Sequence, residues 1–154
     1  MLQPHTPAPR PAAALSDDEA QPFLRLAGSC AHALVVGAHP VPLICGLIRH
    51  GCRAAATIRP GEKPDEGDYD LLLIPRTADF PSLDHIVRLA SRTLALDGRL
   101  VAAAPDAGTA AMLDRRLQLN GFVLSASAPH RTAWSTPGRT PGLLLRFDRR
   151  SPRS

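Results

Sequence analysis

Two short stretches hold the residues that could take part in chemistry, and each of them follows an apolar run. Gly37-Ala38-His39-Pro40 spans the end of the apolar segment 32–38 and the start of a helix-like stretch at 40–50, and Arg59 follows a second apolar segment. Turns between a buried strand and a helix hold phosphorylated ligands against backbone N–H groups. This turn has one glycine of the three in the G-x-G-x-x-G pattern, so it does not by itself predict a dinucleotide site. Arg59 could contact a phosphate, or it could be a solvated loop residue paired with Glu62 or Asp65.

Further candidates follow the later apolar runs. Pro75 and Arg76 end the most apolar segment, and Asp79 comes three residues later. Arg76 could contact an anion and Asp79 could act as a base, although an ordinary loop carboxylate before a helix has the same appearance. His130 and Trp134, in the connection between the last two apolar segments, could close over a substrate. An isolated Trp also packs beneath loops, and a lone histidine such as His39 is often only a turn residue.

The cysteines and histidines do not predict a metal site. Cys30, Cys45 and Cys52 form no CxxC pair, and neither Cys45/Cys52 nor His32/His39 has a recognisable ligand spacing. Their neighbours are apolar or small, so we expect buried, reduced thiols and a cytoplasmic protein.

The charge pattern argues against nucleic acid as a partner. The net charge is +4, and the C-terminal sequence RFDRRSPRS could touch phosphate or acidic surfaces. Aromatic residues make up only 4% of the chain, which leaves few side chains for stacking on bases. The arginine bias of a GC-rich bacterial genome explains the same composition. No apolar run approaches the roughly 20 residues needed to cross a membrane.

The elements needed to position these residues alternate between strand and helix. Helical spacing or caps predict helices at 22–29, 40–50, 83–96 and 110–119. Apolar runs predict strands at 32–38, 52–58, 69–75, 99–105, 122–128 and 142–148. This order predicts a doubly wound α/β sheet, mostly parallel, that ends in an antiparallel hairpin. We expect a Pro/Ala-rich disordered arm at 1–20, one domain at 21–148 and a basic tail at 149–154.

Two stretches resemble class I S-adenosylmethionine-dependent methyltransferases. YDLLLIPRTADFPSLDHIVRLASRTLALDGRLVAAAP has the family's strand beginning Tyr-Asp, its helix with a leucine-rich turn, and the next strand. LDRRLQLNGFVLSASAP is similar to the late helix, Gly-Phe turn and penultimate strand. The resemblance implies a Rossmann-like fold and S-adenosylmethionine as cofactor. It places the cofactor beside six residues: Gly37, Ala38, His39, Arg59, Pro75 and Arg76.

The chain departs from that family at the cofactor site. Val35 stands at the family's acidic position in the first strand, and Arg59 stands where a carboxylate accepts the ribose hydroxyls. The family's third strand and its helix are missing, because only the loop 59–68 joins the second strand to the Tyr-Asp strand. These departures predict a pseudoenzyme that binds or assembles with an unknown protein or small molecule. The alternative is an active methyltransferase with an atypical S-adenosylmethionine site.

Overall fold

The computed structural model describes residues 17–37, 40–64, 67–130 and 142–150, which form a six-stranded sheet covered by helices. The helical elements are α1 (Asp17–Ala27), α2 (Val41–Arg49), the short 3₁₀ turn η1 (Thr77–Asp79), α3 (Leu83–Thr93) and α4 (Ala107–Gln118). The strands are β1 (His32–Val36), β2 (Ala54–Ile58), β3 (Tyr69–Ile74), β4 (Leu94–Ala104), β5 (Phe122–His130) and β6 (Gly142–Arg149). The segments predicted as arm and tail, 1–16 and 151–154, lie outside the described residues.

The sheet topology confirms the predicted fold class. The strand order is β2-β1-β3-β4-β6-β5, in which β6 alone runs antiparallel to its neighbours β4 and β5. β1 pairs in parallel with both β2 and β3, and the described part of the β2–β3 connection contains no helix or strand. β2 is therefore an edge strand, and the sheet ends where the resemblance places one more strand.

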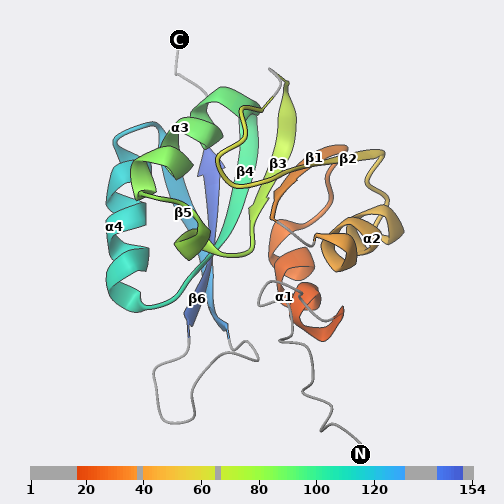
Figure 1. Cartoon of the computed structure of the whole chain (residues 1–154), viewed down its shortest axis with the longest axis horizontal. Helices are drawn as coiled ribbons and strands as arrows, with labels where there is room; N and C mark the ends of the chain where they lie inside the picture. The colour runs from red at the N-terminus through yellow and green to blue at the C-terminus, as the bar shows by residue number, and fades with distance from the viewer. Residues whose placement is uncertain (1–16, 38–39, 65–66, 131–141, 151–154) are drawn as a thin grey trace, which may run out of the picture.

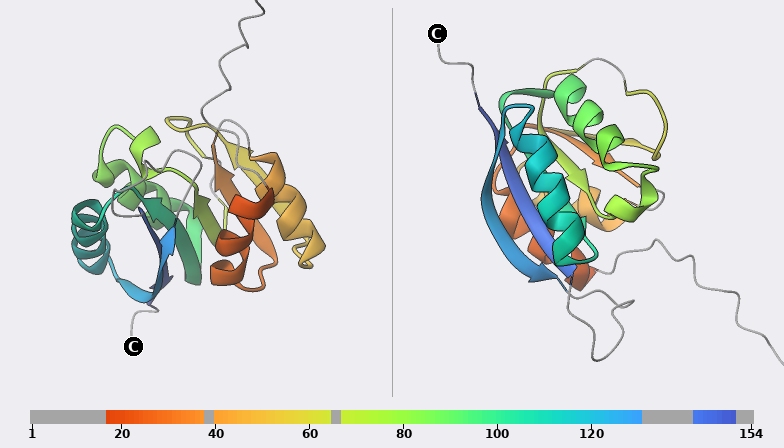
Figure 2. Two further views of the ribbon diagram at one scale, coloured as in Figure 1. Left: turned by 90° about the horizontal axis from the view of Figure 1, so that it is seen from below. Right: turned by 90° about the vertical axis from the view of Figure 1, so that its left-hand side faces the viewer.

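The helices divide between the two faces of the sheet (Figures 1 and 2). Successive residues of β1 point to opposite faces: Ala33 and Val35 pack with α1 and α2, whereas Leu34 and Val36 pack with α3 and α4. Each face therefore has its own apolar cluster, and the continuous apolarity of β1 and β3 reflects burial on both sides.

Several predicted helix boundaries were wrong. α4 begins at Ala107 and not at 110, because Asp106 is its N-cap and accepts a hydrogen bond from the Thr109 N–H. α1 begins at Asp17 and contains Pro22 instead of starting there, since Ala20 continues the buried stripe of the helix upstream of the proline. α3 ends at Thr93 rather than at 96, because Leu94 pairs with Tyr69 as the first residue of β4. Asp97, directly after the predicted helix, has a φ of 67°, which a right-handed helix does not allow.

The aspartate of the Tyr-Asp pair joins two strands at the amino edge of the sheet. The carboxylate of Asp70 accepts hydrogen bonds from the backbone N–H groups of Ala31 at 2.7 Å and His32 at 2.8 Å. Asp70 thereby fixes the entry of β1 against β3, while the rings of Tyr69 and His32 lie 4.4 Å apart. The motif has a structural role here, well away from the opposite edge where ligands bind in such sheets.

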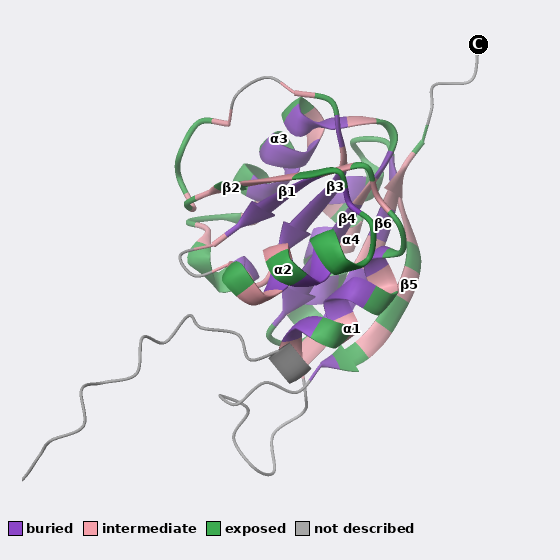
Figure 3. Cartoon of the chain, turned by 90° about the vertical axis from the view of Figure 1, so that its right-hand side faces the viewer, coloured by how far each residue is buried: buried purple, intermediate pink, exposed green. Residues whose placement is uncertain are grey.

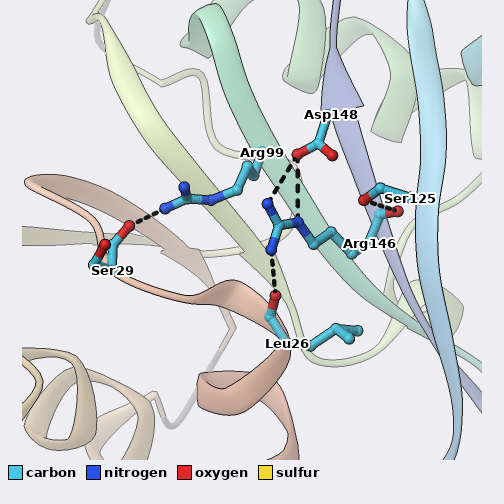
Figure 4. Close-up of polar contacts among 6 residues, drawn as sticks. All are labelled: Leu26, Ser29, Arg99, Ser125, Arg146 and Asp148. Carbon is cyan, nitrogen blue, oxygen red and sulfur yellow. Dashed lines mark hydrogen bonds and ion pairs between the residues drawn. The ribbon is translucent and has the colours of Figure 1, made fainter.

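Two arginines fasten the C-terminal end of α1 to the same edge (Figure 4). Arg146 of β6 donates a hydrogen bond to the Leu26 carbonyl at 3.1 Å and to Asp148 at 3.3 Å. Arg99 of β4 donates to the carbonyl of Ser29. Because the last carbonyls of a helix have no partner within the helix, Arg146 supplies one for Leu26, whereas Arg99 holds the segment that follows α1.

Candidate functional site

The turn after β1 stands at the carboxyl edge of the sheet, as predicted. The Gly37 N–H donates to the carbonyl of Ile58 at 3.0 Å, which joins the ends of β1 and β2. A Cβ added at Gly37 would meet no heavy atom within 4 Å, so the backbone there faces open space. Ala38 and His39, the next two predicted site residues, lie outside the described residues.

The N-terminus of α2 has fewer backbone donors than such a turn usually offers. Pro40 is the N-cap residue and makes no side-chain capping bond, and Pro42 lies in the first turn. Neither proline has an N–H, so a ligand at this helix end loses donors that other residues would supply. Val35, at the position where the resemblance expects an acid, is fully buried in the cluster under α1 and α2.

Arg59 follows β2 directly and is exposed. Its backbone N–H donates to the carboxylate of Glu62 at 3.3 Å, and the Glu62 N–H donates to the Arg59 carbonyl at 3.1 Å. Glu62 therefore contacts the backbone of Arg59, and no ion pair joins the guanidinium to another described residue. Asp65, the other predicted partner, lies outside the described residues.

The residues after β3 form a small ion pair. Arg76 and Asp79 were predicted as an anion contact and a base, and the Arg76 Nε lies 3.6 Å from an Asp79 carboxylate oxygen. Pro75 and Arg76 are half-buried, and Thr77 beside them is buried. The structure thus brings Arg76 and Asp79 together, with each partly neutralising the other.

His130 is the last residue of β5, where it is buried against α1, and not in a loop. Its ring meets the ring of Phe23 edge-on, with the centroids 5.1 Å apart. Burial lowers the pKa of His130 below 6.5, which favours the neutral imidazole. His130 pairs with Gly142 at the start of β6, and the predicted companion Trp134 lies outside the described residues.

A hollow beside the end of β2 was not predicted from the sequence. It lies between the β2–β3 connection and α3, and holds about 710 Å³ of empty space that is partly open to solvent. The connection crosses the sheet toward α3 in Figure 1. The residues around the hollow are Val36, Ile58, Arg59, Gly61, Glu62, Lys63, Pro64, Phe80, Pro81, His85, Arg88, Leu89 and Arg92. The four-residue spacing of Arg88 and Arg92 was the available signal, since it places both on one side of a helix.

The cysteines form no reactive or metal-binding cluster in the part of the chain that the structure describes. Cys52 is buried and Cys30 half-buried, but Cys45 is exposed, so the expectation of burial was wrong for Cys45, whose position on α2 faces solvent. Burial, together with a hydrogen bond to Cys52, raises the pKa of Cys30 to about 12 and keeps the thiol protonated. No three His, Cys, Asp or Glu side chains among the described residues are placed to hold a metal ion. None of the described helices has the length and apolarity required to span a bilayer.

Comparison with solved structures confirms the fold. The glycopeptide N-methyltransferase MtfA, solved with S-adenosylmethionine, is 12% identical with a TM-score of 0.66, and the match covers 93% of this chain and all of MtfA (100%). A 1,6-didemethyltoxoflavin-N1-methyltransferase from Burkholderia thailandensis is 14% identical with a TM-score of 0.66, covering 87% of this chain and 77% of that enzyme. The mitomycin 7-O-methyltransferase MmcR is 17% identical with a TM-score of 0.60, and the match covers 86% of this chain.

This chain spans about half of MmcR, 53% of its length. No protein-family model matches the sequence, and no curated protein matches it either. The matches to solved structures show that the chain has a class I methyltransferase-like fold.

Proposed function

We propose that this chain is a methyltransferase-like domain with a degraded S-adenosylmethionine pocket, and that it serves as a non-catalytic binding or assembly module. The observation that carries the proposal is the exposed Arg59 at the end of β2. A guanidinium only donates hydrogen bonds, whereas the two ribose hydroxyls of the cofactor need an acceptor there. The cofactor also carries a positively charged sulfonium, which a neighbouring cation disfavours.

The helix N-terminus supports the same proposal. Pro40 and Pro42 withdraw two backbone N–H groups from the turn that would face the cofactor. Val35 is buried in the cluster under α1 and α2, so this position offers no carboxylate to a ligand at the edge of the sheet. The hydrogen-bond acceptors and donors at this edge do not match those that S-adenosylmethionine needs. We therefore assign no catalytic step that uses this cofactor.

An active methyltransferase with an atypical site is the second candidate. The open space beside Gly37 favours it, because a ligand could approach that backbone closely. Methyl transfer also asks little of protein side chains, since positioning the two reactants supplies most of the rate enhancement. The two candidates differ in one measurable property, the affinity for the cofactor.

Isothermal titration calorimetry with S-adenosylhomocysteine tests the proposal on the full chain. We expect no binding at millimolar ligand, because the ribose has no acceptor and the helix N-terminus has few donors. Micromolar binding would overturn the proposal in favour of the active enzyme.

A variant designed to bind S-adenosylhomocysteine tests whether Arg59 and the turn explain the absence of binding. The variant Arg59→Asp with His39→Gly and Pro40→Gly restores an acceptor and a glycine turn, so we expect measurable S-adenosylhomocysteine binding. The matched control carries Arg53→Asp with the same two glycines. Arg53 precedes the other end of β2 and is exposed, so this control changes the charge equally without reaching the site. Equal affinity in the two variants would contradict the role assigned to Arg59.

A further inference from the structure

The hollow beside β2 has basic side chains around an apolar floor. Arg59 and Lys63 enter it from the β2–β3 connection, and Arg88 and Arg92 enter it from α3. All four side chains are exposed, so their charges face the solvent-filled space. The floor is apolar and comes from the ends of β1 and β2, from the segment between η1 and α3, and from α3 itself: Val36, Ile58, Phe80 and Leu89.

Few acidic groups offset these charges within the described residues. Glu62 is the one carboxylate around the hollow there, and it accepts its hydrogen bond from the backbone of Arg59. Asp84 lies one turn before Arg88, but its carboxylate is held by Arg116 of α4, whose hydrogen bond lowers the pKa of Asp84. His85 also faces the hollow, and its ring contacts Ser82 at 2.8 Å. Asp65 and Glu66 follow in the sequence and lie outside the described residues.

This arrangement is unfavourable unless an anion is present. Arg88 and Arg92 are four residues apart on α3, where like charges repel, and Arg59 and Lys63 bring two more cations from the opposite side. Guanidinium groups pair with planar or tetrahedral oxyanions through two parallel hydrogen bonds. The enclosed part of the space, about 190 Å³, is small and suits a compact ligand, and the partly apolar floor suits a ligand with an apolar body.

We propose that the hollow binds a small molecule that carries a phosphate or carboxylate group on an apolar, planar body. The oxyanion pairs with Arg59 and Arg92, and the body lies on Ile58 and Phe80. This inference deepens the proposed function by naming the ligand class of the binding module. A polymer such as single-stranded nucleic acid is disfavoured, because the charges gather around one small hollow and few aromatic side chains lie there for stacking on bases.

The test uses 1-naphthyl phosphate as the probe, with 1-naphthol and inorganic phosphate as its two halves. We expect calorimetry on the full chain to give a dissociation constant well below millimolar for the phosphate ester at low salt. The ester should bind at least about tenfold more tightly than either half, since it engages both the cations and the floor. Failure of the ester to bind at millimolar concentration would overturn the inference, as would equal binding of 1-naphthol.

Replacing arginines tests whether the naphthyl ester binds in the hollow. Arg59→Gln with Arg92→Gln should weaken binding of the ester at least about tenfold, and Arg53→Gln should change it by less than about twofold. All three side chains are exposed, so circular dichroism should show an unchanged fold. Equal loss in the double variant and the control would overturn the placement. A single-stranded DNA oligomer that bound more tightly than the ester, with the same arginine dependence, would overturn the choice of a small molecule.

The result with the naphthyl ester and the result with S-adenosylhomocysteine test the two proposals independently. Binding of S-adenosylhomocysteine to the unaltered chain contradicts the proposed function, whatever the naphthyl ester does. Arginine-dependent binding of the ester supports the hollow as an anion site, whatever S-adenosylhomocysteine does.

Discussion

The two ends of the sheet differ in how completely they are built. At one end, the hairpin strand β6 pairs with β4 over six residues and with β5 over eight, and Phe122, Leu145 and Phe147 are buried. At the other end, β2 pairs only with β1, over five residues, and none of its residues is buried. Figure 3 shows the contrast between the exposed β2 and the buried β1 and β3. The hairpin end therefore supplies packing, and the β2 end leaves a surface free for binding.

Arginines at the two ends differ in the same way. Arg146 and Arg149 at the hairpin donate to backbone carbonyls, and Arg149 also lies 5.8 Å from the centre of the Phe122 ring. Arg59 and Arg92 at the other end make no ion pair with any described residue. One residue type is thus structural where it reaches unpaired carbonyls and available to a ligand where it surrounds empty space.

The largest expected effect comes from the core of the hairpin end. Phe147 is fully buried against residues of β4 and β5, so Phe147→Ala leaves a cavity. We expect the free energy of unfolding to fall by about 3–5 kcal/mol in urea denaturation. The matched variant Ile58→Ala at the β2 end, where the side chain is half-buried, should lose about 1 kcal/mol. Equal losses would remove the difference between the two ends.

The sequence predicted the sheet well because its central strands report burial directly. The apolar runs of β1 and β3, and the helices that separate β1 from β2 and β3 from β4, define a doubly wound order without tertiary information. Helix ends were predicted less well, since Pro22 and Leu94 take their places from packing and pairing with distant residues. The sequence around a helix end carries no information about contacts with distant residues.

The candidate site could be predicted only in part. The positions of Gly37 and Arg59 at the carboxyl edge could be predicted because each residue follows an apolar run. Arg88 and Arg92 were missed, because in the sequence they look like the solvated face of α3. Their role depends on the β2–β3 connection passing opposite them, which is a long-range fact. The arginines of β6 were predicted as part of a basic tail that could touch phosphate or acidic surfaces, and Arg146 and Arg149 instead hold helix ends.

The next largest effect distinguishes the arginines that hold backbone carbonyls from the arginines that make no such contact. Arg146→Gln removes the hydrogen bond to the Leu26 carbonyl and the contact with Asp148, so we expect a loss of about 1–3 kcal/mol in the free energy of unfolding. Urea denaturation measures it, with Arg53→Gln as the control, for which we expect a change within about 0.5 kcal/mol. A loss no larger in Arg146→Gln than in the control would show that water replaces those contacts.

A pH dependence at the hairpin end gives a smaller effect. Burial lowers the pKa of His130, while the charge of Glu19 opposes the shift. As the pH falls through 6.5, the unfolded chain takes up a proton before the folded chain does. Stability is therefore complete above pH 6.5, falls below it, and levels off once the folded imidazole is also protonated.

We expect stability to fall between pH 7.5 and 5, by less than the Arg146→Gln variant loses, measured by thermal unfolding. His130→Leu should abolish the part of the pH dependence that begins near 6.5, whereas the exposed His50→Gln should retain it. A pH profile identical in all three proteins would assign the dependence to other groups.

The smallest effect has the opposite sign and belongs to the β2 end. Arg59→Gln removes one of four cations around the hollow, so repulsion decreases and stability should rise by about 0.3 kcal/mol at low salt. Salt near 1 M screens charges beyond about 3 Å, so the gain should vanish there. Replicate thermal unfolding at both salt concentrations measures the difference. A loss of 1 kcal/mol or more in this variant would mean that Arg59, like Arg146, has a structural role. The β2 end would then resemble the hairpin end, because a structural role would explain its cations without a bound ligand.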